Sequence, residues 1–213
     1  MPRARVGRMQ DGYFIAVEGG DGAGKSTQVA LLAEVLRAAG REVVITRQPG
    51  GTELGRQLRE LVLHGAAMAP RAVVLIFAAD KAQHVAEVIA PALALGQVVV
   101  TDRYTDSSVA YQGAARDLGA EAVHELQMWA VGHLVPDLTI VVDLPAAEGR
   151  RRRGDVHDRL ESEADGFHDA VRAHFVAMAR GNPQRYLLVD GLASPEQIHA
   201  TVLERLQVEG VLS

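Results

Sequence analysis

Residues 13–27, YFIAVEGGDGAGKST, decide the fold of this chain. The first six of them, Tyr13–Glu18, form a mostly apolar run of the length of a buried strand. Lys25–Ala39 follow with apolar residues spaced for one face of a helix, and Gly40 ends that pattern. Between the two lies a loop with the spacing Gly-x-x-x-x-Gly-Lys-Ser, which is typical of loops that bind nucleotide phosphates. Because the loop follows a strand and opens a helix, a chance match in a glycine-rich turn is disfavoured.

Each residue type in this loop has a physical role toward phosphate. Glycines let the backbone curl so that successive N–H groups point at phosphate oxygens, and the start of the following helix adds a partial positive charge. Lys25 is expected to reach the β- and γ-phosphates, and Ser26 is expected to bind Mg²⁺. The residues predicted to bind the nucleoside triphosphate are Gly19, Gly20, Asp21, Gly22, Ala23, Gly24, Lys25, Ser26 and Thr27.

A second polar residue stands at the end of a predicted strand, Gln97–Thr101. Asp102 follows this apolar run, and in a parallel sheet its carboxylate would lie beside the glycine-rich loop. A carboxylate in that position holds Mg²⁺ in many nucleotide-binding proteins. An aspartate at a strand end also serves as a helix cap, and this alternative stays open. The predicted metal site is therefore Ser26 together with Asp102.

Strand-length apolar runs alternate with helical patterns along the whole chain. The predicted strands are Tyr13–Glu18, Glu42–Thr46, Gln97–Thr101, Leu138–Asp143 and Arg185–Asp190. The predicted helices after Lys25–Ala39 are Glu53–Leu63, Arg71–Leu95, Glu121–His133, Phe167–Arg180 and Pro195–Gln207. This rhythm predicts an α/β fold with a five-stranded parallel sheet and helices on both faces. We expect a disordered tail over 1–12, one domain over 13–213 and a mobile lid over about 148–160.

Composition narrows the class of protein. The chain has 213 residues, a formal net charge of -5 and no cysteine. The absence of cysteine excludes disulfides, thiolate metal sites and cysteine nucleophiles, and it fits a cytoplasmic location. A net negative charge disfavours non-specific nucleic-acid binding, which usually needs a basic face. We therefore expect no nucleic-acid partner. Because the apolar runs are only of strand length, we also expect no membrane span.

Three further segments resemble the bacterial thymidylate kinase family. They are Thr46–Thr52 (TRQPGGT), Phe77–His84 (FAADKAQH) and Asp102–Gly113 (DRYTDSSVAYQG), and Asp158–Glu161 with Phe167–His168 also match that family. The similarity runs from about Tyr13 to the C-terminus. It implies a P-loop nucleoside monophosphate kinase that uses ATP and Mg²⁺, transfers the γ-phosphate to dTMP to give dTDP in dTTP biosynthesis, and acts as a homodimer.

The resemblance also implies which residues hold dTMP. Arg103 would grip its phosphate, and as a residue just past a strand end Arg103 also lies at the sheet edge where ligands bind in such folds. Arg47 is a second candidate for the phosphate, and a surface ion pair is the alternative for either arginine. By resemblance Asp21 faces the deoxyribose 3′-hydroxyl and the water around the metal, with a helix cap as its alternative. Tyr111 would close on the sugar.

For the base, the resemblance implies that Phe77 stacks on thymine while Ser108 and Gln112 contact its polar edge. A core aromatic is the alternative for Phe77. Two positions depart from the family pattern: Lys81 stands where an arginine is usual, and Gln48 stands where many members have glutamate. The residues predicted to bind the acceptor are Asp21, Arg47, Gln48, Pro49, Phe77, Lys81, Arg103, Ser108, Tyr111 and Gln112.

A run of four arginines, Arg150–Arg153, follows the fourth strand and a short helical segment. Phosphoryl transfer places negative charge on the γ-oxygens, and an arginine aimed there accelerates the reaction strongly. Some members of the family carry this arginine inside the glycine-rich loop, where the present chain has Gly22 and Ala23. The lid should therefore supply it, from Arg152 or Arg153 with Arg159 as a helper. The predicted catalytic residues are Lys25, Arg103, Arg152 and Arg153.

Two other classes of function compete with this one. Another nucleoside monophosphate or deoxynucleoside kinase would differ only in its base pocket, and it stays open as the alternative. A GTPase switch would read guanine with an Asn-Lys-x-Asp motif, but the only asparagine of the chain, Asn182, is followed by Pro183. A nucleotide-sensing module without catalysis is therefore less favoured.

Overall fold

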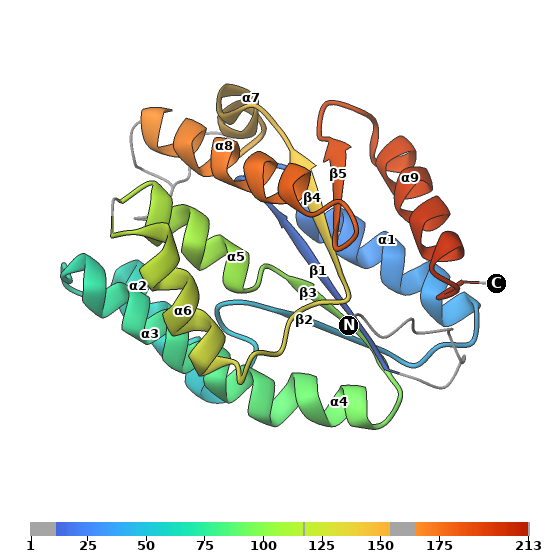
Figure 1. Ribbon diagram of the computed structural model, residues 1–213, viewed down its shortest axis with the longest axis horizontal. Helices are drawn as coiled ribbons and strands as arrows, with labels where there is room; N and C mark the ends of the chain where they lie inside the picture. The colour runs from blue at the N-terminus through green and yellow to red at the C-terminus, as the bar shows by residue number, and fades with distance from the viewer. Residues whose placement is uncertain (1–11, 117, 154–164, 213) are drawn as a thin grey trace.

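Five parallel strands form the central sheet in the order β2-β3-β1-β4-β5 (Figure 1). The computed structural model describes residues 12–116, 118–153 and 165–212 of the chain. The strands are β1 (Tyr13–Gly19), β2 (Val43–Arg47), β3 (Val98–Asp102), β4 (Leu138–Asp143) and β5 (Tyr186–Asp190). The predicted sheet and its parallel strands are thus confirmed.

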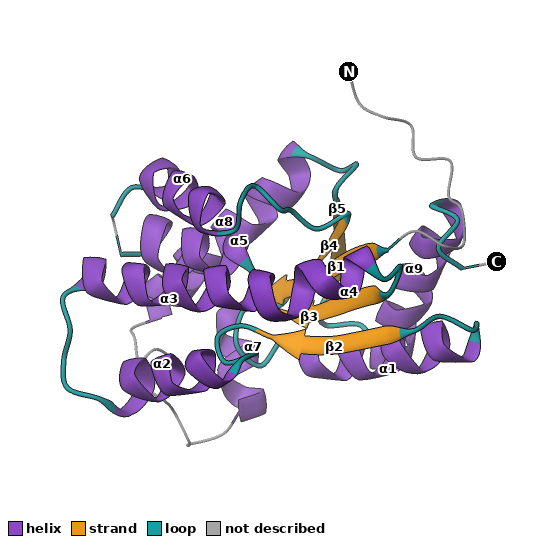
Figure 2. Ribbon diagram, turned by 90° about the horizontal axis from the view of Figure 1, so that it is seen from below, coloured by secondary structure: helices purple, strands orange, loops and turns teal. Residues whose placement is uncertain are grey.

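Alternate side chains of β1 serve the two faces of the sheet. Ile15 and Val17 lie in a core cluster with residues of α1 (Lys25–Ala38) and α9 (Pro195–Val208). Phe14 and Ala16 lie in a second cluster on the other face, with residues of α4 (Ala90–Ala94) and α6 (Ala120–Ala130). Successive residues of a strand point to opposite faces, so an apolar strand such as β1 is buried on both. Figure 2 shows the helices covering the sheet from both sides.

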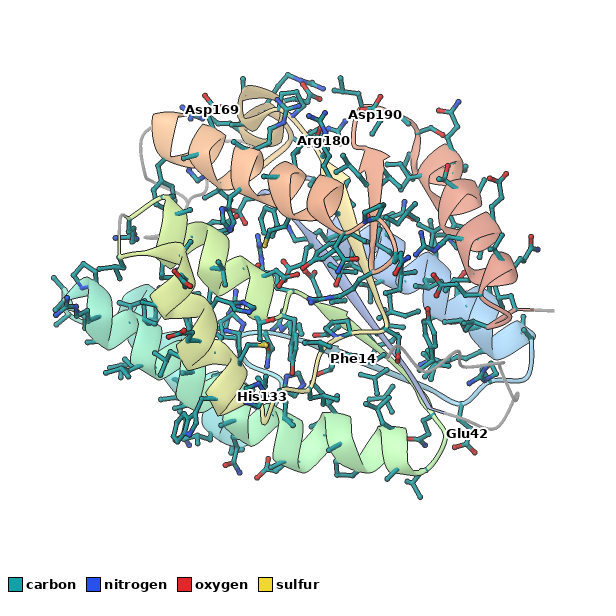
Figure 3. The ribbon with its side chains drawn as sticks, viewed as in Figure 1. Phe14, Glu42, His133, Asp169, Arg180 and Asp190 are labelled. Atoms are coloured by element: carbon teal, nitrogen blue, oxygen red, sulfur yellow. The ribbon has the colours of Figure 1, made fainter. Side chains whose placement is uncertain are left out.

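Charged side chains surround this core. Figure 3 shows Asp169, Arg180 and Asp190 at the periphery, whereas Phe14 lies inside and is almost completely buried. No helix in the described ranges is both long enough and apolar enough to span a membrane.

The predicted helix Arg71–Leu95 is interrupted. The structure contains α3 (Pro70–His84), a π-helical segment η1 (Val85–Ile89) and then α4 (Ala90–Ala94). Pro91 lacks an N–H group and its ring crowds the preceding turn, so a regular α-helical ladder cannot pass through it. The chain widens just before the proline, where the Ala90 N–H donates to the Val85 carbonyl oxygen five residues back.

The remaining helices agree with the prediction to within a few residues, and two segments were missed. The agreeing helices are α2 (Glu53–His64), α6 (Ala120–Ala130), α8 (Asp165–Gly181) and α9 (Pro195–Val208). The missed segments are α5 (Thr105–Ser108) and the π-helical η2 (Val109–Ala114). The short helical segment predicted after the fourth strand is present as α7 (Ala146–Arg153), but the prediction that the arginine run follows it is wrong, because Arg150–Arg153 form the last turn of α7 itself. The predicted lid beyond residue 153 and the predicted tail before residue 12 lie outside the described residues.

Candidate active site

The glycine-rich loop joins β1 to α1 and leaves the start of α1 free for a ligand. Gly24, the N-cap of α1, has a left-handed backbone and no side chain that could cap the helix. The first N–H groups of the helix therefore offer their partial positive charge to an anion. The Lys25 ammonium folds back and donates to the Gly20 carbonyl oxygen over 2.7 Å. Burial, together with the nearby Arg103 guanidinium, lowers the pKa of Lys25 to about 8, and an anionic phosphate beside it would raise that pKa again.

Two oxygen ligands meet at the first turn of α1. The Ser26 hydroxyl donates to Asp102 Oδ2 over 2.7 Å, because β3, which ends at Asp102, pairs with β1. A hydroxyl and a carboxylate beside a phosphate loop are the donors that Mg²⁺ prefers, with substrate phosphates and water completing its shell. These residues therefore fit Mg²⁺. Within the described residues, no group of three or more His, Cys, Asp or Glu could form a metal site of another type.

A cavity opens beside the loop, between the carboxyl ends of β1 and β3 and the helices α2, α3 and α5. Its lining combines charged, polar and aromatic side chains from segments far apart in the sequence: Asp21, Gln48, Pro49, Arg59, Leu63, Phe77, Lys81, Arg103, Tyr104, Ser107, Ser108, Tyr111 and Gln112. Most of the residues predicted to bind the acceptor are thus brought to one cavity. Among the missed residues are Arg59, Leu63, Tyr104 and Ser107.

Arg103 connects the cavity to the phosphate loop. Its Nη1 donates to the Gly19 carbonyl oxygen and to Ser107 Oγ, each over 3.1 Å, and its Nη2 forms an ion pair with Asp21. The guanidinium carbon also lies 5.1 Å from the centre of the Tyr111 ring. An arginine held in this way presents a positive charge at the border between the loop and the cavity.

Tyr111 completes this cluster from η2. Its hydroxyl donates to Asp21 Oδ2 over 2.7 Å. Burial and the Asp21 carboxylate raise the pKa of the Tyr111 hydroxyl, partly offset by Arg103, so it stays protonated and can donate. Asp21 therefore accepts from both Arg103 and Tyr111, and it lies between the phosphate loop and the cavity.

At the opposite end of the cavity, Lys81 and Phe77 lie one helical turn apart on α3. The Lys81 ammonium donates to Ser108 Oγ over 2.8 Å and lies 5.5 Å from the centre of the Phe77 ring. Burial lowers the pKa of Lys81 to about 8. Phe77 also packs into a small core cluster with Val62 and Val73. Its ring therefore both supports the core and lines the cavity.

Two glutamines of the cavity carry unused hydrogen-bonding atoms. Gln48 is buried, and neither its Oε1 nor its Nε2 has a hydrogen-bond partner among the described residues. Gln112 is buried as well, with an unpartnered Oε1. Buried polar atoms are costly unless they are bonded. In a cavity wall they are available to a polar ligand.

Arg47 and Arg59 differ in their exposure to the cavity. Arg47, predicted as a phosphate ligand, is exposed and is absent from the described cavity lining. Arg59 of α2 lines the cavity instead, and its Nη1 donates to the Pro49 carbonyl oxygen over 3.3 Å. Arg59 lies on the helix that follows the Pro-Gly-Gly turn, and this position is the sequence signal that could have identified it as a residue of the cavity.

The arginine run of α7 lies beside the phosphate loop. Arg152 donates to Glu148 and, over 3.1 Å, to the Gly191 carbonyl oxygen, while Arg151 pairs with the same Glu148. The Arg151 and Arg152 guanidinium groups hold the pKa of Glu148 at about 2. The side chain of Arg153, the residue Arg159 and the segment Asp158–Glu161 lie outside the described residues.

Comparisons with known proteins agree with this geometry. The chain matches the family model for thymidylate kinase over residues 17–202. A thymidylate kinase of Leifsonia xyli subsp. xyli is 54% identical over 199 residues, which cover 92% of this chain and 94% of the relative. A thymidylate kinase of Bifidobacterium longum (strain NCC 2705) is 47% identical over 197 residues, with 90% and 96% covered.

Solved structures lead to the same family. The crystal structure of a thymidylate kinase from Ehrlichia chaffeensis is 30% identical to this chain, covers 92% of it and 99% of its own chain, and superimposes with a TM-score of 0.76. The predicted α/β P-loop fold and phosphotransferase class are thereby confirmed. The chain belongs to the thymidylate kinase family, a family of nucleoside monophosphate kinases that use ATP.

Proposed function

We propose that this chain transfers the γ-phosphoryl group of ATP to dTMP, giving dTDP and ADP as a step toward dTTP in the cytoplasm. The observation that carries the proposal is the position of Arg103. Its guanidinium bonds to Gly19 and Asp21 of the phosphate loop while it also lines the neighbouring cavity. Two nucleotides bound in these two sites would bring their phosphates together at this arginine, which can neutralise charge on both.

The donor would lie on the loop of residues 19–24 and the start of α1. The backbone N–H groups would cradle its phosphates, and Lys25 would turn from Gly20 to the β- and γ-phosphates. Ser26 and Asp102 would hold Mg²⁺, which supplies positive charge to the β- and γ-phosphate oxygens when it is bound. Thr27, exposed in the first turn of α1, lies within reach of the same phosphates.

The acceptor phosphate would meet Arg103 and Arg59, which line the cavity, whereas Arg47 does not line it. An oxygen of this phosphate forms the new bond to the γ-phosphorus as the bond from that phosphorus to the β,γ-bridging oxygen breaks and ADP leaves. Arginine suits this position because its planar fork binds two phosphate oxygens and stays charged at every relevant pH. Asp21 and Tyr111 would face the deoxyribose, with Asp21 accepting from its 3′-hydroxyl.

The base would enter the end of the cavity that holds Phe77 and Lys81. Phe77 would stack on thymine, and its ring centre lies 5.5 Å from the Lys81 ammonium. The unpartnered amide atoms of Gln48 and Gln112 and the Ser108 hydroxyl would pair with the polar edge of the base. Pro49 would close the wall beside Gln48.

An arginine from the lid would stabilise the charge of the transition state. Gly22 and Ala23 offer no charge inside the loop, so the γ-phosphoryl group needs a cation from elsewhere. Arg152 lies on α7, which contacts the loop through Gly149. We assign this role to Arg152 or Arg153, which would also help to exclude water from the closed site.

Two copies of the chain would pair through α3 and α6, which contact each other along the outer side of the molecule (Figure 1). Trp129 of α6 is 77% exposed and Leu75 of α3 is 57% exposed. Large apolar side chains exposed on two helices that contact each other are a feature of surfaces that bind other proteins. A homodimer would bury both.

The test is a coupled assay of ADP formation with dTMP, dUMP, CMP, UMP or GMP as the acceptor. We expect turnover with dTMP to exceed that with each of the others. A pyrimidine pocket formed by Phe77, Lys81 and Gln112 would disfavour GMP, and Tyr111 beside the sugar would disfavour the ribose 2′-hydroxyl of CMP and UMP. The 5-methyl group that dUMP lacks adds apolar contact with the pocket. If turnover with dTMP does not exceed that of the acceptor-free control, the proposal is refuted. Faster turnover with another monophosphate would support the alternative kinase instead.

A further inference from the structure

Arg103 has a backbone conformation that a residue with a side chain rarely adopts. Its φ is 69°, in the left-handed region. Such a conformation is strained, and it persists only where the surroundings over-determine it. The strain lies at the residue that joins the phosphate loop to the acceptor cavity, so whatever holds this turn also aims the guanidinium.

Three hydrogen bonds hold the turn. The Arg103 N–H donates to the Val17 carbonyl oxygen over 3.0 Å, and the Thr101 hydroxyl donates to the Arg103 carbonyl oxygen over 2.9 Å. The third bond comes from the next residue, where the Tyr104 N–H donates to Glu18 Oε1 over 2.8 Å. Two of the three acceptors thus belong to the last residues of β1 before the phosphate loop.

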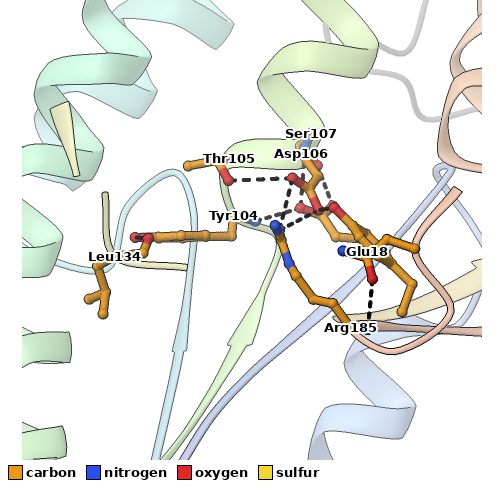
Figure 4. A network of polar contacts seen from close by, with 9 residues as sticks. Glu18, Tyr104, Thr105, Asp106, Ser107, Leu134 and Arg185 are labelled. Carbon is orange, nitrogen blue, oxygen red and sulfur yellow. Dashed lines mark hydrogen bonds and ion pairs between the residues drawn. The ribbon is translucent and has the colours of Figure 1, made fainter. Parts of the chain in front are cut away.

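Glu18 also holds the first turn of α5. The Ser107 N–H donates to Glu18 Oε1 over 3.2 Å, and the Ser107 hydroxyl donates to Glu18 Oε2 over 2.6 Å (Figure 4). Tyr104, the N-cap of α5, provides no side-chain cap of its own. A carboxylate from another strand therefore takes the place of the local cap that helices usually have.

The Ser107 hydroxyl extends this chain of bonds to the guanidinium. Arg103 Nη1 donates to Ser107 Oγ over 3.1 Å, while the same hydroxyl donates to Glu18. Glu18 thus fixes both the backbone beside Arg103 and, through Ser107, the direction of its side chain.

Stability alone gives little reason for a carboxylate at this position. Glu18 is fully buried, and burial with the nearby Asp106 carboxylate raises its pKa, partly offset by Arg103 and Ser107. Asp106 is itself buried and accepts from Tyr186. It also accepts from Arg185 (Figure 4). Burying a charged group is expensive unless it is fully bonded. Every hydrogen bond of the Glu18 carboxylate that the structure describes goes to the segment that carries Arg103.

We infer that Glu18 is a positioning residue for the acceptor phosphate: it holds the strained turn at Arg103 and so aims that guanidinium into the cavity. This inference rests on the proposed function. It concerns the phosphate end of the acceptor alone, because Glu18 does not line the part of the cavity assigned to the base.

The experiment compares the binding of dTMP with that of thymidine, which lacks the phosphate, by calorimetry. In Glu18→Ala we expect the dissociation constant for dTMP to rise at least about tenfold, and that for thymidine less than about threefold. Glu18→Gln keeps one oxygen for the Tyr104 and Ser107 N–H groups, so it should fall between wild type and Glu18→Ala. Ser107→Ala removes the hydroxyl that links Glu18 Oε2 to the Arg103 guanidinium but keeps the Ser107 N–H bond to Glu18, so it should also weaken the binding of dTMP more than that of thymidine.

Asp137→Asn is the matched control. Asp137 Oδ2 accepts from the Phe14 N–H at the opposite end of the same strand, far from the cavity, so this change should leave the preference for dTMP over thymidine at its wild-type value. If Glu18→Ala does not fold, the binding constants of Glu18→Gln and Ser107→Ala test the inference instead. Equal weakening of the binding of dTMP and of thymidine would overturn the inference. So would an unchanged preference for dTMP over thymidine in all variants that fold. A wild-type chain with no preference for dTMP would overturn the proposed function as well.

Discussion

Gly22 of the phosphate loop and Gly149 of α7 lie in direct backbone contact. A Cβ atom on Gly22 would overlap the Gly149 carbonyl oxygen, and a Cβ atom on Gly149 would overlap the Asp21 carbonyl oxygen. Gly22 also has a φ of 77°, which disfavours any side chain there. The contact explains how α7 and its arginines come to lie against the loop: two residues without side chains let the two backbones meet.

Gly149→Ala should therefore lower the stability of the protein, although residue 149 lies in a helix. Helix propensity alone would make the change stabilising by up to about 1 kcal/mol. We expect instead a loss of about 1–3 kcal/mol in the free energy of unfolding, because the new methyl group must push α7 from the loop. The turnover number should fall with it. Denaturant unfolding and steady-state kinetics measure the two effects.

Gly166→Ala is the control for this change. Gly166 lies in α8, and nothing lies within 4 Å of a Cβ atom placed on it. Its replacement should be neutral or stabilising. If Gly149→Ala proves as stable as Gly166→Ala, the contact with the loop does not constrain α7.

The double change Arg152→Ala with Arg153→Ala should lower kcat far more than it weakens dTMP binding. An arginine that acts on the transferring phosphoryl group contributes only in the transition state, so we expect a fall in kcat of about 100-fold or more. Arg151→Ala is the control, because Arg151 pairs with the same Glu148 but its side chain is 74% exposed, against 33% for Arg152. Equal losses in kcat and in dTMP affinity would mean that these arginines bind the ground state.

Lys81→Arg should leave activity with dTMP intact or improve it. Lys81 reaches Ser108 with an ammonium group, a compact point charge, whereas a guanidinium offers its donors in a planar fork. Lys81→Met, of similar length but without a donor, should raise KM for dTMP by about tenfold. A collapse of activity in Lys81→Arg would show that this pocket requires the smaller ammonium group.

His84 should make the protein less stable in mild acid. It is fully buried, its Nε2 lies 2.6 Å from Thr46 Oγ1, and burial with the nearby Lys81 lowers its pKa from 6.5 to about 4. Between these values the unfolded chain binds a proton that the folded protein does not, so stability rises with pH there and falls as pH drops from 6.5 toward 4. The difference amounts to about 2–3 kcal/mol.

The free energy of unfolding of wild type and His84→Gln, measured between pH 4 and pH 7, isolates this contribution from that of the carboxylates. The stability of wild type should fall more steeply with decreasing pH than that of the variant. Parallel profiles would mean that His84 is protonated in the folded protein as readily as in the unfolded chain.

Trp129→Glu should convert a dimer into a monomer. The change places a charge on α6 at the exposed position of Trp129, where it would have to be buried between two copies that pair through α3 and α6. Sedimentation velocity measures the mass. Leu95→Glu is the control, because Leu95 is 74% exposed but lies beyond the end of α4. A wild-type chain that sediments as a monomer would refute the assignment of this face.

The prediction from sequence succeeded where the signal is local. The phosphate loop needs only a fixed spacing of glycines after an apolar run, and the five strands needed only runs of the right length between helical patterns. The prediction failed at Arg150–Arg153, where four charged residues in a row give no apolar period. It also failed at Thr105–Ala114, where the apolar residues are adjacent at 109–111 instead of spaced three or four apart. The interruption before Pro91 had a local signal, the proline itself, which was overlooked.

The sequence by itself determined the fold class, the phosphate loop and the family, because spacing and apolar period are properties of neighbouring residues. Which side chains face the acceptor cavity was decided only by the tertiary structure. Arg47 is exposed and Gln48 is buried, since successive residues of an extended chain point to opposite sides and one residue of register exchanges them. The bonds of Glu18 to Tyr104 and Ser107 join segments more than 80 residues apart in the chain, and only the pairing of β1 with β3 brings those segments together.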